Sequence, residues 1–249
     1  MTSFFRRIRQ ALVRDHKFSK YLVYAIGEII LVVIGILIAL QINNWNESRK
    51  KEAQRLQLIV SLHADAKTTE KRLDFSIAMA QTINTKLTQF LNLLNKEGQQ
   101  IARDTLTNYG SAIFQVASFR PALSSYETAV STGQIALIAN DSLFAQYVQF
   151  KDSHDWFKLH QNLSGDMVYL GNVWQLRKQL GSTKLMLPEL GAYPNRFEQD
   201  DTQLQAFFEA REVYATFESM QWLVQNQVDA LNRAKTANHQ ILATLKALQ

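Results

Sequence analysis

The chain of 249 residues contains no cysteine, three prolines and nine glycines. The absence of cysteine excludes disulfides and thiolate metal sites, and it is compatible with any cellular compartment. Glycine and proline interrupt regular structure, so their scarcity argues against a β-sandwich or barrel and favours long helices. The composition therefore predicts an all-α fold.

Acidic residues are scarce in the first 20 residues, where one aspartate stands against six lysines and arginines. This local excess accounts for the whole net charge of +5, so the remainder of the chain is balanced. A balanced domain lacks the basic surface that nucleic-acid binding requires, and we expect no nucleic-acid partner. Basic residues beside an apolar run instead set membrane orientation and favour anionic lipid headgroups.

The same 20 residues have a helical pattern in which four apolar side chains share one face: Phe4, Phe5, Ile8 and Leu12. Such a pattern fits a basic amphipathic helix lying in the headgroup plane, with Arg6, Arg7 and Arg9 as interfacial anchors. A disordered basic tail is the alternative. We expect the helix, on the cytoplasmic side.

One long hydrophobic run follows, from Tyr21 to Ile42, and its single charged residue is Glu28. At ~1.5 Å per residue these 22 residues form a helix of ~33 Å, enough to cross a hydrocarbon core of ~30 Å. The run is longer than the apolar region of a signal peptide, and no small-x-small cleavage site follows Ala39. We expect an uncleaved signal anchor, a single-pass transmembrane helix.

Basic residues are more numerous before this run than after it, which favours a cytoplasmic N-terminus. Tyr21 and Trp45 lie at its two ends, where interfacial aromatics are common. The later residues would then be extracytoplasmic, in the periplasm of a Gram-negative cell bounded by an inner (cytoplasmic) membrane. We expect three domains: a cytoplasmic amphipathic segment at 1–20, a transmembrane helix at 21–42 and a periplasmic helical bundle at 43–249.

Glu28 shares a helical face with Gly35 and Ala39, which form a small-xxx-small pair that permits close helix approach. An acid inside a bilayer usually faces a partner or carries protons. We expect a contact with a second copy of the chain or with another inner-membrane protein. The alternatives are that Glu28 reaches the headgroups, or that it takes part in proton-coupled work.

No glycine or proline interrupts residues 36–97, so the membrane helix is expected to continue outward as far as Gly98. Spacing of three and four predicts one buried stripe, although three polar members weaken a strict coiled coil. The stripe consists of Leu56, Ile59, His63, Ala66, Glu70, Leu73, Ile77, Ala80, Asn84, Leu87, Leu91 and Leu94.

The rest of the chain predicts further helices that complete an extracytoplasmic bundle. Ser124 and Glu127 have the spacing of a capping box, and Asp104, Thr105, Asn140 or Asp141 could cap other helices. We expect helices at about 104–117, 121–133, 140–180 and 201–249, with a long loop over 181–200.

Three stretches resemble a known family: FFRRIRQ at 4–10, KFSKYLVYAIGEIILVVIGILIALQINNWNE at 17–47 and SSYETAVSTGQIALIAND at 124–141. They are similar to domain of unknown function 6090, a family of single-pass Bacteroidetes membrane proteins. The resemblance implies a membrane anchor with an outer helical domain. It implies no activity.

Motifs for catalysis are weak. The stretch KDSHDWFKLH gathers Asp152, His154, Asp155 and His160, but its histidines are six residues apart, out of register for a metal pair on a helix. We expect a solvated polar face there, and no metal or cofactor.

The sequence has no phosphate loop, no GxSxG and no Rossmann fingerprint. Five aromatic residues could line a ligand pocket but are expected in the bundle core: Trp156, Phe157, Tyr169, Trp174 and Trp222.

Three functions remain open. The first is a non-enzymatic, membrane-anchored scaffold or accessory protein that engages in protein–protein interaction and forms oligomers. The second is a periplasmic sensory or ligand-binding module, which would need a partner to relay its signal because no second membrane helix and no output domain are expected. The third is a proton-coupled single-helix subunit using Glu28, which a fully functional Glu28→Gln variant would exclude. We expect the first.

Overall fold

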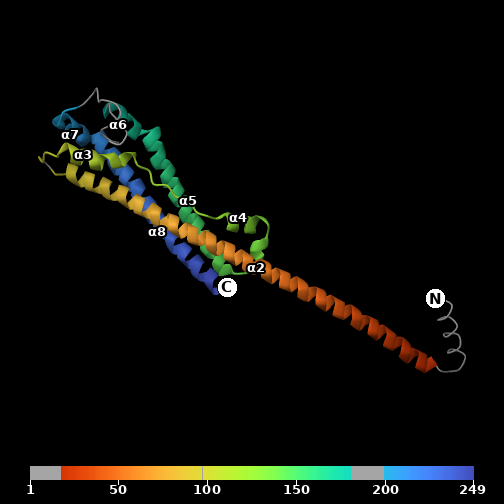
Figure 1. The fold of residues 1–249 in the computed structure, drawn as a ribbon. Helices are drawn as coiled ribbons and strands as arrows, with labels where there is room; N and C mark the ends of the chain where they lie inside the picture. The colour runs from red at the N-terminus through yellow and green to blue at the C-terminus, as the bar shows by residue number, and fades with distance from the viewer. Residues whose placement is uncertain (1–17, 97, 181–198) are drawn as a thin grey trace, which may run out of the picture. The chain divides into compact units, whose positions relative to one another are not determined.

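The computed structural model describes residues 18–96, 98–180 and 199–249, with side chains from residue 21 onward. Within these ranges all regular structure is α-helix or 3₁₀-helix, which confirms the all-α prediction (Figure 1). The predicted amphipathic helix over residues 1–20 lies largely outside the described residues. Contacts divide the chain into two units, Met1–Gln57 and Leu58–Gln249, which are described separately below.

Helix α2 spans Phe18–Leu94, so the prediction of one long helix is confirmed, although it ends before Gly98. The amide of Asn95 still bonds to the Leu91 carbonyl at 3.1 Å, and the chain then turns. Gly98 has a φ of +73°, in the left-handed region that glycine adopts without steric cost.

The second unit contains the C-terminal part of α2 and all the later helices. Helices α5 and α8 pack along each other, and α2 lies beside them (Figure 1). The remaining helices are α3 (Arg103–Gly110), η1 (Ser111–Phe114), α4 (Ser124–Ser131), η2 (Gln134–Leu137), α5 (Asp141–Tyr169), α6 (Asn172–Leu180), α7 (Asp201–Glu209) and α8 (Arg211–Ala247).

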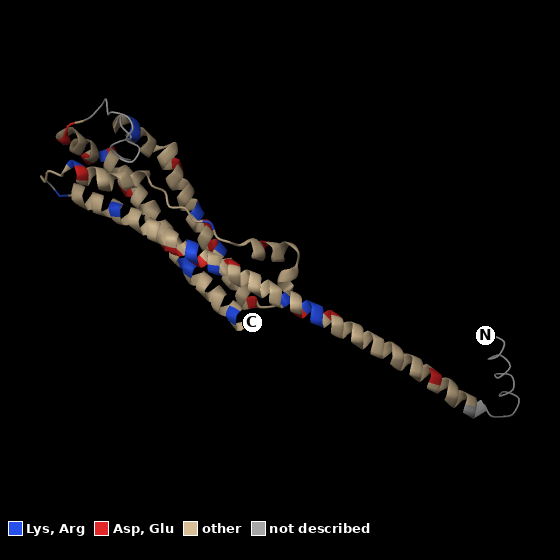
Figure 2. Cartoon of the chain, in the orientation of Figure 1, with Lys and Arg blue, Asp and Glu red and all other residues tan. Residues whose placement is uncertain are grey.

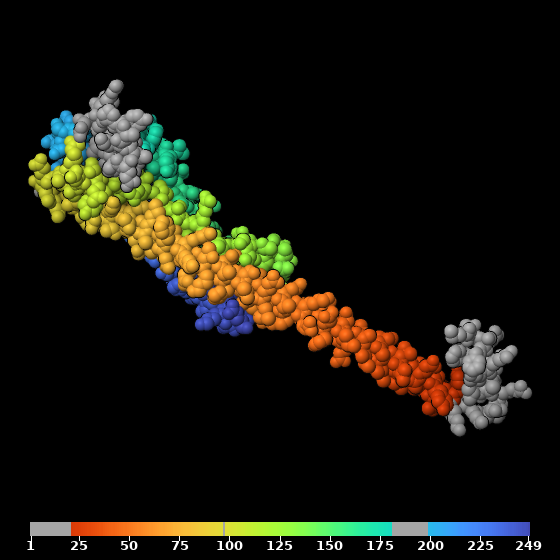
Figure 3. Space-filling model, in the orientation of Figure 1, coloured from red at the N-terminus to blue at the C-terminus, as the bar shows by residue number. Residues whose placement is uncertain are grey.

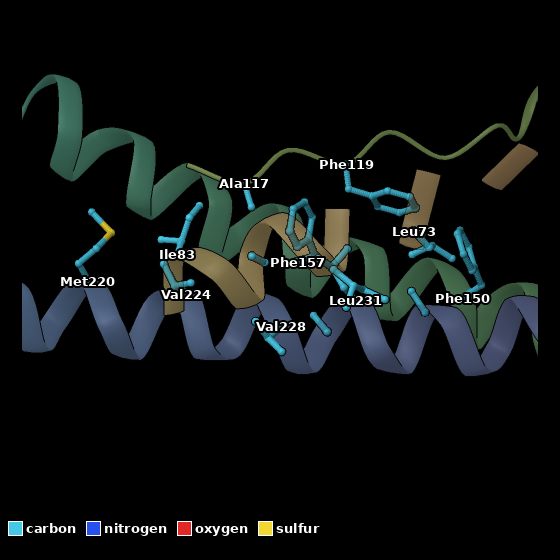
Figure 4. Packing of buried hydrophobic residues seen from close by; sticks show 14 of the residues in the cluster. Leu73, Ile83, Ala117, Phe119, Phe150, Phe157, Met220, Val224, Val228 and Leu231 are labelled. Atoms are coloured by element: carbon cyan, nitrogen blue, oxygen red, sulfur yellow. The ribbon is translucent and has the colours of Figure 1, made fainter. Parts of the chain in front are cut away.

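The predicted stripe on α2 forms one side of the core. Its fully buried members include Ile59, Leu73 and Leu87, which join Phe150 and Phe157 of α5 in one hydrophobic cluster (Figure 4). The outermost member, Leu56, is exposed. Periodicity at three and four residues thus identified the packed face, because a helix buries only the side that meets its neighbours.

Two polar members of the stripe contact α8. The Asn84 amide donates to Gln225 Oε1 at 2.7 Å, and Glu70 Oε1 lies 3.2 Å from His239 Nε2. Polar groups in a helix interface are stabilising when they find partners, and they fix which residues face each other. These contacts explain why the stripe departs from a strict heptad.

Residues 115–123 form an extended segment whose backbone is held by side chains. Thr69 Oγ1 bonds both the carbonyl and the amide of Ala122, and Ser76 Oγ donates to the Ser118 carbonyl at 2.8 Å. From α5, Gln161 Nε2 donates to the Ala117 carbonyl at 2.9 Å. These side chains satisfy backbone groups that have no ladder or helix to pair with.

The predicted start of the helix at 121–133 is wrong. Helix α4 begins at Ser124, and its N-cap residue Leu123 makes no side-chain cap. The cap comes from α2, where Asp65 Oδ2 accepts a hydrogen bond from the Ser125 amide at 2.8 Å. In Figure 3 this part of the chain, in green, rests against the orange part of α2.

Other helix limits also differ. Ala102, not Asp104 or Thr105, is the N-cap of α3. The Asn140 side chain caps α5 by accepting from the Leu143 amide at 2.7 Å, as expected. The helix expected over 140–180 is broken after Tyr169, and the one over 201–249 is broken at Ala210, whose ψ of 134° is extended. Residues 181–198 of the predicted loop lie outside the described residues.

Candidate interaction surfaces

The N-terminal part of α2 is apolar on all sides. It is the single helix among the described residues that is long and apolar enough to cross a membrane, and none of its most apolar window is buried. Glu28, Gly35 and Ala39 are all exposed, and a Cβ on Gly35 would meet no atom within 4 Å. Figure 2 shows this part of the helix almost free of charged residues. A helix with this surface suits a lipid environment, with a small-residue face available to a second helix.

The predicted interfacial anchors fall partly outside the described residues, since Arg6, Arg7 and Arg9 are not described. Tyr21 is half-buried and Trp45 is exposed. The Arg49 guanidinium carbon lies 5.7 Å from the centre of the Trp45 ring, within cation–π range. The end of the apolar run is therefore marked by an amphipathic aromatic next to a cation.

Helix α5 carries apolar residues on two sides. One side, with Tyr147, Phe150 and Phe157, is buried in the core. The other leaves five large apolar side chains between 42% and 54% exposed, and we call them the α5 stripe: Phe144, Val148, Trp156, Leu159 and Leu163. A helix at the surface of a bundle normally exposes polar residues, so these exposed apolar side chains indicate a candidate surface for protein–protein contact.

The prediction that five aromatic residues lie in the core is wrong for four of them. Phe157 is buried, whereas Trp156, Tyr169, Trp174 and Trp222 are exposed. The sequence signal for the α5 stripe was present, because α5 has large apolar residues outside its core-facing side, among exposed polar residues such as Asp152 and Asp155. Periodicity alone gave no sign of which side faces α8.

The segment KDSHDWFKLH does not form a solvated face throughout. His160 is buried, 2% exposed, with Nδ1 2.9 Å from the Trp156 carbonyl oxygen. Its ring lies 4.7 Å from the Trp156 ring and 5.6 Å from the Trp222 ring, centre to centre. Beneath it, buried Gln227 donates to the His160 carbonyl at 3.2 Å and to Ser164 Oγ at 2.8 Å.

The other histidine of this segment packs elsewhere. The His154 ring contacts the Phe119 ring, with centres 5.7 Å apart, and its Nδ1 lies 3.8 Å from Asp155 Oδ1. Burial lowers the pKa of His154, against the opposing pull of the Asp155 carboxylate. In the part of the chain that the structure describes, no three His, Asp or Glu side chains gather as a metal site would need.

The stretch at 124–141 packs onto α2 and α5 through Tyr126. Its ring stacks on Tyr147 with centres 4.0 Å apart and planes 16° apart. Burial raises the pKa of Tyr147, and the nearby Asp65 carboxylate adds to the effect. Asp65 therefore both caps α4 and lies beside the stacked pair, which gives this stretch a structural role.

These features define a helical protein with an apolar helix of membrane-spanning length and a second unit that has its own core. Residues 28–163, more than half of the chain, match the family model described as a family of unknown function, DUF6090. The chain belongs to this family. The match runs from Glu28 in α2 to Leu163 in α5, and so covers residues 28–42 of the apolar run, the α4 stretch and the α5 stripe. Curated proteins and solved structures give no significant match.

Proposed function

We propose that the protein is a membrane-anchored interaction protein, a non-enzymatic scaffold or accessory subunit that acts as an oligomer. Residues 21–42 cross the inner (cytoplasmic) membrane once. The N-terminus is cytoplasmic, where the basic segment meets anionic headgroups, and the bundle is periplasmic. The proposal places the protein in a Bacteroidetes cell, as the resemblance noted in the sequence implies, and such cells have a periplasm.

The observation that carries the proposal is the α5 stripe. Five large apolar side chains on one helix remain about half exposed, although α5 already has a complete apolar face in the core. Leaving such a surface in water is unfavourable by roughly 25 cal/mol for each Å² of apolar area, and contiguous exposed patches mark protein contacts. Self-pairing of the stripe is the simplest way to cover it, because a two-fold contact places the same surface on both copies.

Residues 21–42, the proposed membrane span, offer a second and independent surface for contact between copies of the chain. Glu28, Gly35 and Ala39 share one helical face, and the Gly35 position has open space for a neighbouring helix. Small residues allow backbones to approach closely in a bilayer, and a protonated or hydrogen-bonded acid gains from a partner there. Contacts in the membrane and outside it would act together in one oligomer.

The absence of native cysteine makes the test direct. Single cysteines at Leu159 and Leu163 on the stripe, and at exposed Arg233 on α8 as a matched control, would be expressed in cells. We expect disulfide-linked dimers from the Leu159→Cys and Leu163→Cys chains and monomers from Arg233→Cys, since the periplasm oxidises thiols.

Two results would contradict the proposal. Dimers in equal amount from Arg233→Cys would mean random collision. Monomers alone from both stripe variants, with the thiols still modified by a membrane-impermeant maleimide, would mean that the stripe is periplasmic but uncovered by a second copy.

A further inference from the structure

An open groove of about 890 Å³ lies between the C-terminal end of α5, the start of α6 and the N-terminal third of α8. This volume is within the range of small-molecule sites, roughly 300–1,000 Å³. The groove differs from the surface proposed for the oligomer, because Leu163 is the one residue that lines the groove and also belongs to the α5 stripe. From its walls and its charge, we propose that the groove binds a cationic ligand with an apolar body, an alkylamine that carries an aliphatic or aryl group.

The groove follows from the break between α5 and α6. The amides of Leu170 and Gly171 both bond to the Asp166 carbonyl, at 2.9 and 2.8 Å, which ends α5. A Cβ on Gly171 would lie 3.2 Å from Met167 Cα and 3.3 Å from the Asp166 carbonyl oxygen. The tight break therefore favours glycine at this position, and the groove lies beside it.

The walls of the groove are mainly apolar. Leu163, Met167 and Leu170 come from α5 and the break, and Trp222 and Leu223 come from α8. Two apolar side chains that line the groove are largely exposed: Leu170, in the break after α5, is 77% exposed, and Trp222, on α8, is 58% exposed. An apolar ligand that filled the space would cover both.

The charge in the groove has one sign. Asp166 and Glu218 line it, and no lysine or arginine is among the described residues that do so. Both carboxylates are exposed, and neither forms an ion pair within the described ranges. Two acids beside low-dielectric walls favour a cation and oppose fatty acids and other anions. The Trp222 indole adds a face on which an ammonium group is attracted.

The test uses the full chain in nanodiscs of zwitterionic lipid, labelled with 5-fluorotryptophan. The chain has four tryptophans, and a Trp222→Phe variant identifies the Trp222 resonance. The probes are 4-phenylbutylamine, the neutral 4-phenylbutanol and the anionic 4-phenylbutyrate, which share one apolar body. Trp45, beside the apolar run, reports partitioning of a probe into lipid.

We expect the amine to shift the Trp222 resonance saturably and at least tenfold more tightly than the alcohol, and the carboxylate to leave it unmoved. The Asp166→Asn, Glu218→Gln double variant should weaken amine binding at least tenfold and leave alcohol binding unchanged, which also shows that the groove is intact. An Asp152→Asn, Asp155→Asn chain, which removes two exposed acids elsewhere on α5, should bind the amine as the original chain does.

Three results would overturn the proposal. The amine and the alcohol could bind equally, so that the acids contribute nothing. The double variant could bind the amine as tightly as the original chain. All four tryptophan resonances could move together without saturation, so that the probe enters lipid rather than the groove. None of these results bears on the oligomer, which the cysteine variants test separately.

Discussion

Helix α2 contains two regions that are equally helical but differ in composition and in surroundings. Residues 21–42 are apolar all round and richer in aliphatic residues, and nearly all of their side chains are exposed. Residues 58–94 bury one stripe and expose charged or polar residues on the other side. Both the number of apolar residues and their arrangement around the helix therefore distinguish a helix that suits lipid from one that packs against neighbouring helices. Of the four predictions below, the first two each change one of these regions, and the last two concern contacts made within the second unit.

The largest effect is expected from the packed region. Phe90 is fully buried, with its ring 4.6 Å from Phe217 and 5.1 Å from Phe208, centre to centre. Phe90→Ala should lower the free energy of unfolding by about 3–5 kcal/mol, because it leaves a cavity where α2, α7 and α8 meet. Chemical denaturation of the full chain in nanodiscs measures it. Phe75→Ala, at a position 71% exposed on the same helix, should change stability by less than about 0.5 kcal/mol.

The next effect is on the span. Val32→Arg places a charge at its middle, which is unfavourable by about 3 kcal/mol on insertion scales. The variant should be extracted from membranes by alkaline carbonate, whereas the original chain stays in the pellet. The melting temperature of the bundle in detergent should not change. A bundle that melts earlier would mean that the two regions do not act independently.

A smaller effect is expected where α2 caps α4. Asp65→Ala removes the acceptor for the Ser125 amide and should lower stability by about 1–2 kcal/mol. Asp104→Ala is the matched control, because Asp104 lies in the first turn of α3 without capping it. Denaturation curves for the two variants would give the same midpoint if the cross-helix cap contributed nothing.

The smallest effect concerns pH. Burial lowers the folded pKa of His154 below its ordinary value of 6.5, so the unfolded chain binds the proton more readily. Its contribution is thus present above pH 6.5 and is lost as the pH falls from 6.5 through the folded pKa. His154→Gln should flatten this part of the stability curve. Chemical denaturation of the original chain and of this variant at a series of pH values measures the effect.

The sequence predicted those parts of the fold that depend on local pattern. The prediction of the buried stripe on α2 was correct because periodicity reports directly on a buried face. The prediction that Asn140 caps α5 was correct because an N-cap acts on residues within three positions of itself. The cap of α4 was not predictable, since Asp65 and Ser125 are 60 residues apart. Nor did glycine content reveal the break in α5: Gly165 lies within the helix, and Gly171 follows its end.

The candidate surfaces were harder to predict than the fold. The exposed state of Trp156 and Trp222 depends on which side of α5 meets α8, and apolar residues on both sides of α5 hide that choice. The groove needs Leu170 and Glu218 to come together, and Leu170 lies in the break after α5 whereas Glu218 lies on α8, far apart in sequence. The small-residue face of the span, read from spacing alone, stays a prediction.

The extended segment 115–123 has a consequence for how this chain can vary. Connecting segments usually accept insertions because their backbones bond to water. Here Thr69, Arg72 and Ser76, one after another along α2, bond to Ala122, Arg120 and Ser118 in reverse order. One inserted residue would move each carbonyl off its donor, so this stretch without helix is expected to be the part of the chain least tolerant of a change in length.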